Sequence, residues 1–117
     1  MARLSVSDLN ELQINIHKIL SYQNAPVLGE LQKPFLVGEK LYDAPHTWGA
    51  QYLELLVGTH DDNGYSTTGI PETDNIEELF DRDLSSEWTA SQLISKINSG
   101  KSFIHHAGHS NTDYTMR

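Results

Sequence analysis

Histidines cluster near the end of the sequence, where an apolar run, Phe103–Ala107, leads into Gly108 and His109. Three of the six histidines fall within residues 105–109. An imidazole that follows a strand and a glycine is exposed at the edge of a sheet, where it can exchange protons near neutral pH. His109 is therefore the leading candidate for a general base. The alternative is a loop histidine that is bonded to a neighbouring backbone group.

A carboxylate occupies the equivalent place after a second apolar run. Pro34–Gly38 has no polar alternation, which is typical of a strand covered on both faces, and Glu39 follows it directly. Such a carboxylate could orient the imidazole of His109, as in a nucleophile–base–acid triad. It could equally be a solvated group at a strand end or a helix cap, and the sequence leaves both readings open.

The other two histidines of the cluster allow a metal hypothesis. His105, His109 and Glu39 are residue types that bind zinc, but the sequence has no His-Glu-x-x-His pattern and no evident fourth ligand. His105 and His106 are successive strand residues and must point to opposite faces, so at least one is expected to pack against a covering helix.

Two acidic segments raise the question of calcium. Asp61–Gly64 is a strong turn signal, and it fails the EF-hand spacing because Thr59 stands where the first acidic ligand should be. The acidic run from Glu72 to Asp83 is expected to be a solvated surface loop, with a contribution of calcium ligands as the alternative. We therefore predict a turn at the first segment and a loop at the second.

The elements that would position these residues alternate between helices and strands, which favours an α/β layer with a largely parallel sheet. Ligands bind such sheets at the carboxyl ends of the strands, where Glu39 and His109 are both expected. The predicted elements are a helix capped by Ser7 and ending near Tyr22, a strand at 34–38, a loop at 40–47, a helix capped by Thr47, a weaker strand at 65–70, mostly irregular chain at 71–88, a helix from the Thr89–Gln92 capping box to Gly100, and a strand at 103–107.

Composition limits the classes of function. The 117 residues suffice for one small domain, and the net charge of −8 argues against binding to nucleic acids or to anionic membranes. No apolar segment approaches the length of a membrane span, and we expect no signal peptide within these residues because Met1 leads into a polar segment. The sequence contains no cysteine, which excludes disulfides, thiolate metal sites and a thiol nucleophile within it.

Several strings, in this order and spacing, resemble one family. They are Thr47–Tyr52, Asn63–Gly69, Leu79–Asp83, Ile97–Gly100 and His105–Asn111. Their succession is similar to the middle of the gingipain-type cysteine peptidases, secreted bacterial enzymes with a caspase-like fold. The resemblance implies a three-layer α/β arrangement, with a short, mostly parallel sheet between helices, that is incomplete in this chain. Residues 1–117 would form a single partial domain.

The resemblance also implies roles for individual residues. The family's Gly-His motif falls on His109, the catalytic histidine, and the next backbone N–H, on Ser110, would help to form the oxyanion hole. Many relatives have glycine at the position of Ser110, but a backbone donor remains. Glu39 or Asp43 would support the histidine, and we favour Glu39. The family's nucleophilic cysteine follows a few tens of residues beyond the histidine, so this chain alone is expected to be inactive.

The remaining expectations concern partners. The resemblance implies a peptide or protein substrate, a secreted or cell-surface location, and no cofactor, although the parent domain could hold calcium. A sheet that lacks its outer strands exposes unpaired edges, through which the chain could self-associate. Two other functions stay open: a non-catalytic interaction module with a caspase-like fold, and a zinc-dependent hydrolase built on His105 and His109.

Overall fold

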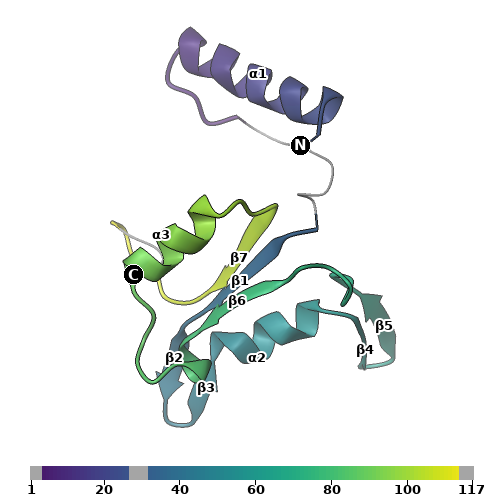
Figure 1. Cartoon of the computed structure of the whole chain (residues 1–117), viewed down its shortest axis with the longest axis vertical. Coiled ribbons are helices and arrows are strands. Elements are labelled where there is room, and N and C mark those ends of the chain that lie inside the picture. Colours follow the sequence, from purple (N-terminus) through teal and green to yellow (C-terminus); the bar gives the residue numbers. More distant parts are fainter. Residues whose placement is uncertain (1–3, 27–31, 114–117) are drawn as a thin grey trace.

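The computed structural model describes residues 4–26 and 32–113, which form an α/β fold (Figure 1). The helices are α1 (Leu9–Asn24), α2 (Gly49–Leu53) and α3 (Ala90–Asn98), with short 3-10 turns η1 (Glu54–Leu56) and η2 (Asp81–Asp83). The strands are β1 (Pro34–Gly38), β2 (Lys40–Asp43), β3 (His46–Trp48), β4 (Thr59–Asp62), β5 (Tyr65–Thr68), β6 (Glu77–Phe80) and β7 (Phe103–Ala107).

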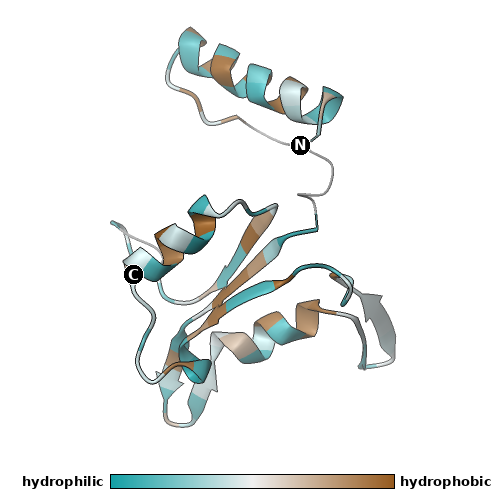
Figure 2. Ribbon diagram, viewed as in Figure 1, coloured by the Kyte–Doolittle hydropathy of each residue, from teal (hydrophilic) through white to brown (hydrophobic). Residues whose placement is uncertain are grey.

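The principal sheet is parallel and has the order β6-β1-β7. All five residues of β1 are buried, as expected for a central strand whose two faces are covered, and the middle of β1 is coloured as apolar in Figure 2. Gly38 pairs with Phe80 of β6 and with Ala107 of β7, so the three strands end side by side. The predicted strands at 34–38 and 103–107 are confirmed with these bounds.

Helices cover both faces of this sheet (Figure 1). On the α3 face, Phe35 and Val37 pack with Leu93 and Trp88. On the opposite face, Leu36 and Phe80 pack with Ala50 and Leu53 of α2. The alternating residues of β1 thus supply both cores, and the expected arrangement of a short, mostly parallel sheet between helices is present, consistent with part of a caspase-like domain.

The segment after Glu39 differs from its prediction. The expected loop at 40–47 is an antiparallel hairpin, β2–β3, and the next helix is capped at Trp48 rather than at Thr47 and spans five residues. Gly49 opens α2 so close to β7 that a Cβ there would collide with the Ala107 carbonyl oxygen. The start of α2 packs closely against the ends of β1 and β7, and this contact sets where the helix begins. No local sequence pattern reveals such a contact.

The weaker strand predicted at 65–70 is shorter and belongs to a separate hairpin. β4 and β5 pair antiparallel around Asn63 and Gly64, whose φ angles of 52° and 81° are those of a tight hairpin turn. The turn predicted at Asp61–Gly64 is therefore confirmed.

The region predicted as mostly irregular, 71–88, holds the third strand of the principal sheet. Only four residues long, β6 pairs with β1 and buries Leu79 and Phe80. Its first residue, Glu77, forms ion pairs with Lys96 and Lys101, which hold the pKa of its carboxyl below the usual value. Pairing with β1 determines this strand, and the acidic neighbours conceal it in the sequence.

The helix ends test the capping predictions. In α3 the capping box between Thr89 and Gln92 is present, and Gly100 follows the helix with a φ of 81°. In α1 the cap is Asp8 rather than Ser7, because the Asp8 carboxylate accepts the N–H of Glu11 at 2.8 Å.

The first helix packs little against the rest of the chain. α1 runs to Asn24, two residues beyond its predicted end, and none of its residues is buried. Among the described residues, no helix is long and apolar enough to cross a membrane. β6 and β7 are the outer strands of the described sheet, and self-association through them stays a prediction.

Candidate active site

Three functional groups meet at one edge of the principal sheet because its strands are parallel. Glu39 directly follows β1, Asp81 directly follows β6, and Gly108 and His109 follow β7. This is the carboxyl edge, where sheets of this class bind ligands. The structure therefore brings together Glu39 and His109, the two residues that the sequence placed after strands.

Glu39 is fully buried and is held on both sides. Its N–H donates to the Ala107 carbonyl at 2.9 Å, and its own carbonyl accepts the Gly49 N–H at 2.8 Å. Its carboxylate receives the main-chain N–H of His109 on Oε2 at 2.8 Å, and Oε1 lies 3.1 Å from Nε2 of His106. Glu39 is thus not a solvated carboxylate, and it contacts His109 through the main chain.

The hydrogen bond from the His109 N–H to the Glu39 carboxylate requires a glycine at position 108. A Cβ at residue 108 would collide with the His106 imidazole at Nε2 and would lie 2.5 Å from Cδ of Glu39. Real Cβ atoms do not approach a neighbour so closely, and both neighbours are held by their own partners. The absence of a side chain lets the buried carboxylate reach the main chain of the next residue.

The imidazole of His109 is exposed and has a second anchor. Its Nε2 lies 3.2 Å from the carbonyl oxygen of Lys40. Because a carbonyl oxygen only accepts hydrogen bonds, Nε2 must carry the proton in this contact. The neutral ring then keeps the lone pair on Nδ1, the nitrogen that can accept a proton.

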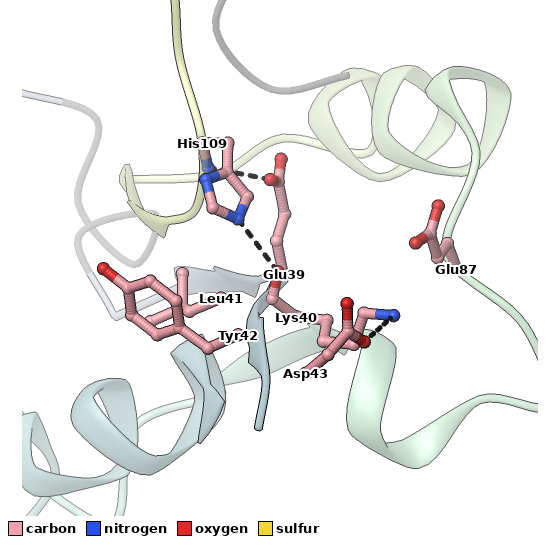
Figure 3. A pocket seen from close by; sticks show the side chains of 7 residues that line it. All are labelled: Glu39, Lys40, Leu41, Tyr42, Asp43, Glu87 and His109. Carbon is pink, nitrogen blue, oxygen red and sulfur yellow. Dashed lines mark hydrogen bonds and ion pairs between the residues drawn. The ribbon is translucent and has the colours of Figure 1, made fainter. Parts of the chain in front are cut away.

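A pocket of about 240 Å³ opens beside this imidazole (Figure 3). Besides His109 and Glu39 it is lined by the four residues of β2 and by Glu87, from the loop before α3. Lys40 pairs with Asp43 at 3.0 Å and holds the pKa of the Asp43 carboxyl below its usual value. Asp43, the alternative support for the histidine, thus pairs with Lys40 at the pocket wall.

The sequence analysis did not single out two residues that complete the site. His106, for which a packing role was expected, contacts the ring of Trp88 edge-on, with ring centroids 6.5 Å apart, as well as Glu39. Asp81 is 5% exposed and accepts the N–H groups of Lys40 and Trp88, at 3.0 and 2.8 Å. The sequence signal for Asp81 was its position directly after the apolar pair Leu79–Phe80. Glu39 occupies a similar position, directly after Gly38 at the end of an apolar run.

The metal hypothesis gains no support from this geometry. His105 lines a separate hollow with Phe103 and Ile70, whereas His109 lines the pocket beside Glu39. Across residues 4–26 and 32–113, no group of three His, Asp or Glu side chains is placed to hold a metal ion. The chemistry that the described arrangement offers is proton transfer by His109.

Comparison with protein families decides which proteins this chain is related to. The family model described as "Peptidase family C25" matches residues 1–117, the whole chain. The chain belongs to peptidase family C25. This is the gingipain family of cysteine peptidases, so the resemblance seen in the sequence is confirmed. Among curated proteins and solved structures, nothing matches the chain.

Membership in peptidase family C25 gives the site a chemical context. The family consists of hydrolases that act on proteins or peptides through a cysteine. The C25 chain contains no cysteine, but it presents an anchored imidazole at the carboxyl edge of its sheet. An exposed imidazole held in this way is a group that could exchange protons in such a reaction.

Proposed function

We propose that this chain carries the histidine half of the Cys–His dyad of a gingipain-like cysteine endopeptidase. The nucleophilic cysteine would be contributed by residues outside the given sequence. The observation that carries the proposal is the double anchoring of His109, whose main-chain N–H donates to Glu39 and whose ring nitrogen Nε2 faces the Lys40 carbonyl. The two contacts fix the position of the imidazole and leave Nδ1 as the base.

The proposed reaction follows from this placement. Nδ1 of His109 takes the proton of the cysteine thiol, and the thiolate attacks the carbonyl carbon of the scissile peptide bond. The developing oxyanion accepts hydrogen bonds from the main-chain N–H of Ser110 and from that of the cysteine. The imidazolium of His109 then gives its proton to the leaving amine, which leaves a thioester that water hydrolyses.

Glu39 and Lys40 would support the imidazolium that forms in the first step. The Lys40 carbonyl accepts from Nε2 in both the neutral and the charged ring, so the ring need not turn during the reaction. The buried carboxylate of Glu39 holds the main chain of His109, which keeps the ring beside the Lys40 carbonyl. The same proposal includes the secreted or cell-surface location that the sequence resemblance implies.

The test is to express the longest polypeptide that the gene encodes beside the 117-residue chain. Both are assayed with a library of internally quenched peptides, with and without prior treatment with iodoacetamide. We expect hydrolysis by the longer polypeptide that iodoacetamide abolishes, and none by the 117-residue chain, which has no cysteine. Iodoacetamide-sensitive hydrolysis by the 117-residue chain itself would contradict the proposal.

The absence of cysteine also favours a second candidate, a non-catalytic module that uses the same fold for interaction. The same experiment separates the two. If the longer polypeptide has no cysteine, or has one and hydrolyses no peptide in the library, the interaction module is the better account.

A further inference from the structure

We infer that Asp81 is a positioning residue for His109, acting through the main chain of Lys40. The relevance of this role to catalysis rests on the proposed function, but the contacts themselves do not. Asp81 stands at the end of β6, across the central strand from His109, at the end of β7. Its carboxylate joins two other chain segments, at Lys40 and at Trp88.

The first connection runs through Lys40. Oδ2 of Asp81 accepts the Lys40 N–H at 3.0 Å, and the Lys40 carbonyl faces Nε2 of His109 at 3.2 Å. The main chain of Lys40 is therefore held on one side by a buried carboxylate and holds the ring on the other. Without the Asp81 contact, the Lys40 carbonyl loses the restraint that aims it at the imidazole.

The second connection runs through Trp88. Oδ1 of Asp81 accepts the Trp88 N–H at 2.8 Å, and the Trp88 ring packs edge-on against His106. His106 in turn holds the Glu39 carboxylate that receives the N–H of His109. Both anchors of His109, on its ring and on its main chain, can thus be followed back to Asp81.

The chemistry of the position requires a carboxylate. Two main-chain donors approach one side chain, and an aspartate can accept from both because each of its oxygens is an acceptor. An asparagine has a single oxygen and would turn its NH₂ group toward the second donor. The carboxylate is also 5% exposed, so water cannot readily replace a lost contact.

A purely structural carboxylate would stabilise the strand end and leave the imidazole unaffected, so the test needs a readout on the ring. Nitrogen-15 NMR of the full 117-residue chain gives the ratio of the Nε2–H to the Nδ1–H form of neutral His109. In Asp81→Asn we expect this ratio to fall about threefold to tenfold, the worth of one ordinary hydrogen bond. This measurement needs no peptidase activity, so it stands or fails separately from the proposed function.

Two variants control for other effects. Asp83→Asn removes a charge from the same turn, where Asp83 is exposed and pairs with Arg82. Leu53→Val loosens the core under α2, in a cluster that holds none of Lys40, Trp88 and His106. Both are expected to keep the unsubstituted ratio. An unchanged ratio in Asp81→Asn, or an equal fall in Leu53→Val, overturns the inference.

A measurement on the unsubstituted chain covers the case in which Asp81→Asn does not fold. A scalar coupling across the hydrogen bond, between the Lys40 amide nitrogen and the Asp81 carboxylate carbon, is expected together with slow exchange of the Lys40 amide proton. Detection of both supports the inference. A Lys40 amide that exchanges at the rate of an unstructured peptide overturns it.

Discussion

Replacing His109 with alanine in the longer polypeptide of the proposed function is expected to lower kcat/KM about thousandfold, within the range for loss of a general acid–base group. The cost falls on kcat, because the alanine side chain neither takes the thiol proton nor returns it to the leaving amine. The imidazole is exposed, so its removal leaves no cavity in the core. Steady-state kinetics on one peptide substrate, with the melting temperature as the check on folding, measures the effect.

His105 supplies the matched control for this substitution. It directly precedes His106, which contacts Glu39, but it faces the other side of the sheet, where it lines a hollow with Phe103. His105→Ala is expected to keep kcat/KM within about twofold, as surface substitutions away from a site usually do. Equal losses in the two variants would show that the assay reports damage to the fold and not the role of His109.

The second large effect is expected on stability, from Gly108→Ala. The new Cβ would strike the His106 imidazole and the Glu39 carboxyl, both held in place by hydrogen bonds. Overpacking typically costs about 1–3 kcal/mol, and disturbing a buried carboxylate adds a similar amount. We expect the free energy of unfolding, measured in urea, to fall by about 3 kcal/mol. The His109 amide proton should exchange faster as well.

Gly64→Ala is the control because it separates collision from backbone strain. Gly64 has a φ of 81° and no atom near the place of a new Cβ, so alanine there is strained but meets nothing. It should cost about 1–2 kcal/mol and leave exchange of the His109 amide unchanged. If Gly108→Ala is no more destabilising than Gly64→Ala, the close contact among residues 39, 106 and 108 is not as described.

The sequence was sufficient for the elements whose patterns are local. β1 and β7 were predicted because each is a short apolar run that a turn-forming segment bounds, and α3 because its capping box and terminal glycine are adjacent in sequence. The meeting of Glu39 with His109 followed from one general rule, that parallel strands end at the same edge. The way in which they meet, through a main-chain N–H, did not follow from it.

The elements that the sequence did not reveal depend on contacts between distant residues. β6 is four residues long and begins with two glutamates, so only pairing with β1 makes it a strand. Asp81 was hidden for the same reason, because its partners at Lys40 and Trp88 lie 41 and 7 residues away. The β2–β3 hairpin was missed because its four-residue and three-residue strands carry no clear alternation.

The claim that His109 activates a cysteine is tested most directly by the pH dependence of cysteine alkylation in the longer polypeptide. A thiol beside an imidazolium has a pKa well below its ordinary value of about 8.5, because the positive ring stabilises the thiolate. We predict that iodoacetamide reacts rapidly down to about pH 6 in the unsubstituted protein, and that in His109→Ala the profile moves up toward about pH 8.5. Superimposable profiles for the two proteins would contradict the account.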